Sequence, residues 1–186
     1  MCVDFKNLNK AWPKDDFPPP HIDVLVDNTV VNALMSFMDG ISGYNQIKMA
    51  PKDMTKTTST IERGIYCYTV MPFGLKNVGV AYQRMAMALL HDMMHNKVEV
   101  YVDVMIVNSK DKECHITNVR KLFERIKEYK LRLNPQKCTF GVNAGILLGF
   151  LISDRGIEVD PSKIKAILDI PPPKSEKEIR GFLGRL

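Results

Sequence analysis

Two aspartates interrupt apolar, strand-like segments of the sequence, and their side chains are the ones best suited to chemistry. Asp39 ends the run VNALMSFMD at residues 31–39, and Asp103 lies inside the run VEVYVDVMIVNS at residues 98–109. β-branched and aromatic residues favour a packed, pleated surface, so a carboxylate within such a run is out of place unless it is used. Two converging carboxylates repel each other unless a cation lies between them. The pair indicates either a divalent-cation site for phosphoryl transfer or two separate turn residues, which aspartates at strand ends commonly are.

A second candidate site is the sequence His91-Asp92-Met93-Met94-His95. On a helix, this H-x-x-x-H spacing would place two imidazoles on one face, as in zinc hydrolases. The second position is Asp rather than Glu, and no third ligand is evident. The pattern is more typical of two histidines near a helix C-terminus, where the helix dipole favours them.

A third candidate is the segment MPFGLKNVGVAYQ at residues 71–83, a loop with Pro and Gly that runs into a helical pattern. Glycine in such a loop allows the backbone to approach a ligand closely. An ordinary turn is the alternative interpretation.

The elements that must position these residues follow from the hydrophobic periodicity. Strands are expected where apolar and β-branched residues run together, at 31–39, 65–71, 98–102, 104–108, 138–142 and 146–153. Helices are expected where apolar residues recur at helical spacing or capping residues occur, at 78–95, 111–130, 159–170 and 175–186. The proline-rich segment 13–23 predicts an extended loop, and residues 1–10 predict an N-terminal strand. This mixture of separated strands and helices predicts an α+β fold.

The excess positive charge lies in the second half of the chain. The net charge is +5, yet residues 1–96 hold 9 Lys and Arg against 9 Asp and Glu, whereas residues 97–186 hold 17 against 12. Most of the excess lies in residues 119–137. A basic stripe of this kind is typical of a polyanion partner, and a solvated helix face explains it nearly as well.

The remaining composition limits the compartment. Four scattered cysteines without a C-x-x-C pair argue against a zinc ribbon or a secreted disulfide framework, and we expect them to be unpaired, buried and in an intracellular setting. No apolar run reaches the roughly 18 residues of a membrane span, so no membrane partner is expected.

Six stretches, taken in order, resemble the successive motifs of a reverse transcriptase, most closely those of gypsy-type LTR retrotransposons. They are MCVDFKNLNK, SFMDGISGYNQI, MPFGLKNVGVAYQ, YVDV, LRLNPQKCTFG and LLGFLISDRGI. The resemblance covers essentially all of the chain and implies a right-hand polymerase fold, with a palm built on an antiparallel sheet. It implies partial fingers at 1–30 and 50–75, a palm at 31–49 and 76–155, and the start of the thumb or connection at 156–186.

The resemblance also implies roles for individual residues. Asp39 and Asp103 match metal-binding aspartates that hold two Mg²⁺ (or Mn²⁺) ions in the family, and Tyr44 matches the aromatic that selects deoxynucleotides at the sugar 2′ position. The residues that match the nucleotide and template site are Tyr44, Phe73, Gly74, Gln83 and Lys137, and those of the primer-grip region are Leu148, Gly149 and Phe150. The implied partners are an RNA or DNA template with its primer and a dNTP, within a larger Pol polyprotein.

Two departures from the family pattern qualify this expectation. The Y-x-D-D motif reads Y-V-D-V here, so Val104 occupies the place of the second aspartate, and valine cannot ligate a metal ion. The basic residues that bind the triphosphate in the family lie upstream of the first residue. We therefore expect a fragment or decayed copy of a polymerase whose RNA-directed DNA synthesis is impaired, or alternatively a non-catalytic nucleic-acid-binding remnant.

Overall fold

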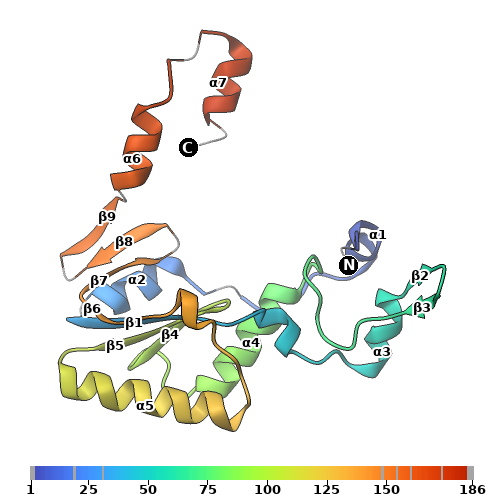
Figure 1. Ribbon diagram of the computed structural model, residues 1–186, viewed down its shortest axis with the longest axis horizontal. Coiled ribbons are helices and arrows are strands. Elements are labelled where there is room, and N and C mark those ends of the chain that lie inside the picture. Colours follow the sequence, from blue (N-terminus) through green and yellow to red (C-terminus); the bar gives the residue numbers. More distant parts are fainter. Residues whose placement is uncertain are drawn as a thin grey trace.

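A four-stranded antiparallel sheet forms the centre of the protein in a computed structural model (Figure 1). The structure describes residues 3–18, 20–30, 32–147, 149–153, 155–159, 161–172 and 174–183. Its strands are β1 (Leu34–Asp39), β4 (Val98–Tyr101), β5 (Val104–Ser109) and β6 (Thr139–Val142), in the order β4-β5-β1-β6. The register pairs Asp39 with Val104 across β1 and β5, and Tyr101 with Val104 across β4 and β5. The end of β1 and the β4–β5 turn therefore meet at one corner of the sheet.

Both faces of this sheet are covered, which explains why its strands are almost continuously apolar. On one face, α4 (Val78–Leu90) packs against β4, and α5 (Lys112–Glu128) packs against β5 and β1. Tyr82, Leu90 and Leu122 from these helices share a cluster with Met38 and Val107 of the sheet.

The opposite face carries α2 (Ile22–Val30) and the strands β7 (Ala144–Leu147) and β8 (Phe150–Ser153). Leu25 of α2, Leu147 of β7 and Ile152 of β8 pack against Phe37 and Ile106 in a second cluster. Because side chains alternate along a strand, Met35 and Phe37 point to this face, whereas Ser36 and Met38 point to the face of α5.

The segments that precede and follow β1 form an extension at one end of the molecule (Figure 1). It contains the helices α1 (Lys6–Ala11), η1 (Gly43–Gln46), α3 (Pro51–Met54) and η2 (Thr55–Thr57), and the antiparallel hairpin of β2 (Ser59–Ile61) and β3 (Gly64–Tyr66). A small cluster around Phe5, Met49, Leu75 and Val78 joins this extension to the N-terminus of α4.

The C-terminal part leaves the sheet at the other end of the molecule. After η3 (Pro135–Lys137) and β6, the strands β7, β8 and β9 (Gly156–Val159) form a three-stranded antiparallel sheet. The helices α6 (Pro161–Leu168) and α7 (Glu176–Leu183) then extend away from the body (Figure 1). At the start of α7 the Glu178 amide donates to Ser175 Oγ, as in an N-terminal cap, while the Glu178 carboxylate accepts from the Lys174 amide.

Several expectations from the sequence are wrong in detail. Residues 6–11 are helical rather than part of a strand, because the Asp4 carboxylate accepts the Lys6 amide and starts the turn. The strand expected at 65–71 is limited to β3 and a single bridge between Lys48 and Val70. Helix α2 was not expected from the sequence. Cys67 and Cys114 are free but exposed rather than buried.

The other expected elements are present. The helices expected near 78–95 and 111–130 correspond to α4 and α5, although α4 ends at Leu90. In the part of the chain that the structure describes, no helix is both long and apolar enough to cross a membrane.

Candidate active site

Asp39 ends β1 at the corner where that strand meets the β4–β5 turn. Its main-chain oxygen accepts the Asn134 amide at 2.8 Å, which anchors the segment that leads into η3. Its carboxylate oxygen Oδ2 lies 3.3 Å from Lys137 Nζ, with the Asp39 side chain 19% exposed and that of Lys137 63% exposed. Asp39 and Lys137, far apart in sequence, are thus an ion pair in the folded chain.

Asp103 lies in the two-residue turn between β4 and β5. The Gly40 amide donates to the Asp103 main-chain oxygen at 3.0 Å, so the residue that follows Asp39 is bonded directly to Asp103. The preceding turn residue, Val102, has φ of 52°, a left-handed conformation that is a genuine outlier for a β-branched side chain. The tertiary structure must hold this turn in place, because such backbone strain costs about 1–3 kcal/mol.

Gln83 of α4 supplies that support. Its side chain is buried, its Nε2 donates to the Val100 carbonyl at 3.0 Å, and its Oε1 accepts the Val102 amide at 2.7 Å. Both ends of one amide group therefore bind the backbone of the turn that carries Asp103. The structure places Gln83 behind the turn, as a positioning residue, and its predicted contact with template remains a prediction.

Tyr82, next to Gln83, lies close enough to both aspartates to feel their charges and was not identified from the sequence. Burial, and then the negative charges of Asp103 and Asp39, raise the pKa of its phenol to about 12. A Cβ atom on Gly40 would lie 2.9 Å from the Tyr82 hydroxyl, and one on Gly43 would lie 3.2 Å from Asp103 Cβ. Glycine at these two positions allows the chain after Asp39 to pass closely over Tyr82 and Asp103.

Three aromatic side chains continue from this corner toward the surface. The Tyr44 ring makes edge contacts with Tyr82, at 5.9 Å between centroids, and with Phe73, at 5.1 Å. Burial and the Asp103 carboxylate raise the pKa of Tyr44. Phe73 is 58% exposed, and Gly74 has φ of 93°, which glycine adopts without strain. The structure thus brings Tyr44 and Phe73 together beside Asp103.

Val104 stands directly opposite Asp39 in the sheet. Cross-strand partners leave a sheet on the same face, so its side chain lies beside that of Asp39. It is half-buried and packs against the cluster formed by α2, β7 and β8. Glu99, the acidic residue of β4, does not take the place of an acid at position 104. Its carboxylate lies 3.0 Å from Asn28 Nδ2 and 3.2 Å from His95 Nδ1.

The donor set at this corner is consequently incomplete for two metal ions. Two carboxylates are present, and Lys137 already neutralises one of them. Among the described residues, no group of three or more His, Cys, Asp or Glu side chains is placed to hold a metal ion. The described residues at this corner therefore do not fit a two-metal site in full.

The remaining predicted residues lie apart from the corner or outside the described residues. Leu148 belongs to the undescribed positions, Gly149 has φ of 86° in the β7–β8 turn, and Phe150 begins β8 and is 47% exposed. No hydrogen bond or ring contact in the described part of the chain joins Gly149 or Phe150 to Asp39 or Asp103. Their assignment to a primer grip stays a prediction.

The zinc hypothesis fails on geometry. Because α4 ends at Leu90, His91 and His95 do not share a helix, and His95 has φ of 61°. His91 Nδ1 lies 3.2 Å from the Ala88 carbonyl oxygen, whereas His95 pairs with Glu99. The two imidazoles make separate structural contacts.

Comparison with known proteins agrees with the order of motifs and with the fold. The model of the family described as "Reverse transcriptase (RNA-dependent DNA polymerase)" matches residues 1–184. Over 184 residues, 99% of the chain, it is 35% identical to the Pol polyprotein of the transposon opus and 30% identical to that of the transposon gypsy, both from Drosophila melanogaster. The chain spans 18% of the length of each of these polyproteins.

Solved structures share the fold. The protease-reverse transcriptase of a foamy virus in complex with double-stranded DNA superposes with a TM-score of 0.88 at 22% identity, over 100% of this chain and 38% of the viral chain. The same viral protein in complex with an RNA/DNA hybrid gives 0.87 over 100% of this chain and 25% of the viral chain. The expected right-hand polymerase fold is thereby confirmed. The chain belongs to the reverse transcriptase family, and its relatives are Pol polyproteins of gypsy-type retrotransposons.

Proposed function

We propose that this chain is the palm, with partial fingers and the beginning of a thumb, of a retrotransposon RNA-directed DNA polymerase whose chemistry is impaired. One observation carries the proposal: a backbone hydrogen bond joins the Asp39 and Asp103 segments at one corner of the sheet, while Val104 fills the adjacent ligand position. In this proposal, Asp39 and Asp103 keep the places of the family's metal-binding aspartates, and Val104 replaces the remaining metal ligand.

The arrangement supports binding of a primer terminus and a nucleotide at this corner. Asp39 and Asp103 would hold Mg²⁺ or Mn²⁺, which would supply charge stabilisation for phosphoryl transfer. Tyr82 is protonated at neutral pH, as an ordinary tyrosine is, and its raised pKa of about 12 keeps it so in alkaline solution, so it adds no third negative charge. Tyr44 and Phe73 offer adjoining aromatic surfaces for a sugar and a base.

The domain boundaries of the proposal follow the resemblance, with fingers at 1–30 and 50–75, palm at 31–49 and 76–155, and thumb from 156. Within the first of these ranges, α2 packs on the central sheet through Leu25 and Val26. The end of this proposed fingers range thus contacts the palm directly.

Primer extension tests the proposal. The chain is incubated with an RNA template, a labelled DNA primer, dNTPs and either Mg²⁺ or Mn²⁺, beside an Asp39→Asn variant as the inactive control. We expect extension by the natural sequence to be no faster than that by Asp39→Asn. Processive synthesis by the natural sequence would contradict the impairment.

The second candidate is a non-catalytic nucleic-acid-binding remnant, which the Lys137–Asp39 ion pair favours because an ammonium there neutralises a metal ligand. For both candidates we expect weak binding to template–primer duplex that falls as salt is raised, since such contacts release counterions. Fluorescence anisotropy of a labelled template–primer measures this binding. Absence of any binding at low salt would contradict both candidates.

A further inference from the structure

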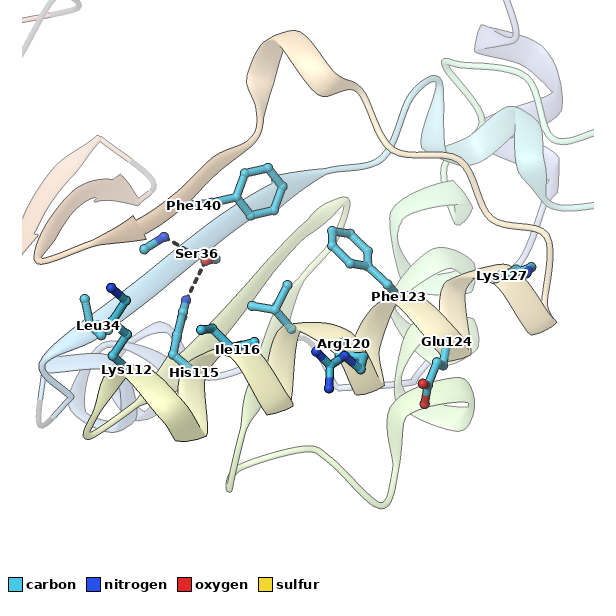
Figure 2. Close-up of a pocket in the computed structure, with 12 residues that line it drawn as sticks. Leu34, Ser36, Lys112, His115, Ile116, Arg120, Phe123, Glu124, Lys127 and Phe140 are labelled. Carbon is cyan, nitrogen blue, oxygen red and sulfur yellow. Dashed lines mark hydrogen bonds between the residues drawn. The ribbon is translucent and has the colours of Figure 1, made fainter.

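A groove outside the candidate active site lies between α5 and β6, on the α5 face of the central sheet (Figure 2). Its volume is about 830 Å³, and its apolar walls are Leu34, Ile116, Val119, Phe123 and Phe140. Because side chains alternate along β1, Asp39 points to the same face of the sheet as Met35 and Phe37, which is the face opposite the groove. The groove and the Asp39 corner are therefore separate sites.

The groove exposes large apolar side chains, and hydrogen bonds hold the elements at its base together. Ile116 is 51% exposed, Phe123 40% and Phe140 50%, and the two phenyl rings lie 6.0 Å apart between centroids. In the floor, Ser36 Oγ lies 2.7 Å from His115 Nε2 and accepts the Gly141 amide at 3.0 Å. These bonds tie β1, α5 and β6 together. A contiguous apolar patch with a polar rim is typical of an interaction site.

Three cations of α5 line the groove at two-turn intervals, against a single carboxylate, that of Glu124, among the residues that line it. They are Lys112, Arg120 and Lys127, and with a helical rise of about 1.5 Å per residue the row extends over roughly 22 Å. In the part of the chain that the structure describes, none of the three makes an ion pair. Arg125, in contrast, is paired with Asp92 at 3.0 Å and with Glu128 at 3.7 Å.

The occupant must match both the row of charges and the exposed rings. Unpaired cations at regular intervals attract a polyanion, and two of them, Arg120 and Lys127, belong to the positive excess found at residues 119–137. Single-stranded nucleic acid combines spaced phosphates with flat base faces that stack on aromatic side chains, whereas a duplex hides those faces. We propose that this groove binds single-stranded RNA or DNA, with phosphates on Lys112, Arg120 and Lys127 and a base on Phe140. The proposal does not depend on catalysis at Asp39.

Binding of fluorescein-labelled (dT)12 and (rU)12, measured by anisotropy over a salt series, tests this site. The variant Lys112→Gln/Arg120→Gln/Lys127→Gln is expected to bind at least about tenfold more weakly at low salt. Its slope of log affinity against log salt is expected to be shallower by about 2, because each lost phosphate contact removes about 0.7.

A matched variant separates this groove from general electrostatic attraction. Lys97→Gln/Lys110→Gln/Lys121→Gln removes the same charge from residues that do not line the groove. We expect less than about a twofold change in affinity for it. Equal weakening by both triple variants would overturn the proposal.

The aromatic contact is tested by Phe140→Leu, which keeps an apolar residue at an exposed position. We expect about fivefold weaker binding with an unchanged salt slope, since stacking on one aromatic side chain is worth about 1 kcal/mol or more. Unchanged affinity would overturn the assigned base contact. Circular dichroism melts of all variants verify that each is folded.

Photocrosslinking locates the site without any variant. A (dT)12 strand with one 4-thiothymidine is irradiated on the natural chain, and the crosslinked peptide is identified by mass spectrometry. Crosslinks in residues 112–127 or 139–142 support the groove, and crosslinks confined to the Tyr44–Phe73 region or to Lys137 would overturn it. Displacement of (dT)12 by poly-L-glutamate at equal charge concentration would also overturn it, in favour of an acidic polypeptide partner.

Discussion

Replacement of Val104 by Asp places a carboxylate next to Asp39 and is expected to increase the stabilisation of the folded chain by divalent metal. In metal-free buffer the new carboxylate lies beside Asp39, since cross-strand Cβ atoms are about 5 Å apart. At that separation two unit charges repel by about 1 kcal/mol in water and about 3 kcal/mol at an effective dielectric constant of 20.

The loss of apolar contact adds to this repulsion. Val104 is half-buried against the cluster of α2, β7 and β8, so removal of its methyl groups costs about 1 kcal/mol of the roughly 1.5–3 kcal/mol of full burial. Lys137, already on Asp39, offsets part of the repulsion. We expect Val104→Asp to lower the free energy of unfolding by about 2–4 kcal/mol in EDTA.

Binding of a divalent metal ion is expected to restore part of the free energy of unfolding that Val104→Asp loses in EDTA. A cation that binds only the folded state at tenfold its dissociation constant stabilises that state by about 1.4 kcal/mol. For a chain of this length, that corresponds to an increase in Tm of about 3–6 °C. The natural sequence, with one carboxylate fewer, is expected to shift by less than half as much.

Thermal melts followed by circular dichroism, with EDTA or with millimolar Mg²⁺ or Mn²⁺, measure these changes. Val104→Asn is the matched control, because it loses the same apolar contact without gaining a charge. Equal metal-induced shifts for the natural sequence, Val104→Asp and Val104→Asn would refute the reasoning, and position 104 would then be outside any metal site.

Three further predictions concern the support of the same corner. Gln83→Leu leaves the Val100 carbonyl and the Val102 amide without their buried partner, so we expect the free energy of unfolding in urea to fall by about 2–4 kcal/mol. A change below about 0.5 kcal/mol would show that the turn does not need these two hydrogen bonds. Val102→Asn, which tolerates a positive φ, is expected to raise the free energy of unfolding by about 0.5–1 kcal/mol in the same assay, and a loss would contradict the strain assigned to this turn. The raised pKa of Tyr82 means that the folded state retains its proton longer than the unfolded state, so stability is full below pH 10 and declines as the pH rises toward 12. Absorbance at 295 nm should show one tyrosine that titrates near 12, and that signal should be absent in Tyr82→Phe.

The elements with strong local signals could be predicted from the sequence, and those with weak signals could not. The β4–β5 pair and α5 follow from a β-branched run and from apolar residues at helical spacing, and both are present. Helix α2 was missed, because IDVLVDNTV is rich in β-branched residues and becomes helical by packing Leu25 and Val26 against the sheet. The end of α4 at Leu90 also separates His91 from His95, which no local pattern indicated.

The sequence by itself determined the family, through the order of its motifs, and placed at position 104 a valine, whose side chain has no group that could bind a metal ion. Tertiary structure alone decided how the aspartates meet, since the register of β1 with β5 and the Gly40–Asp103 hydrogen bond are contacts between distant segments. It also decided that Tyr82 lies near both carboxylates and that Gln83 binds the backbone of the β4–β5 turn. These roles depend on which face of α4 packs against the sheet. Hydrophobic periodicity predicts that a helix has a buried face, but it does not predict which backbone groups that face will contact.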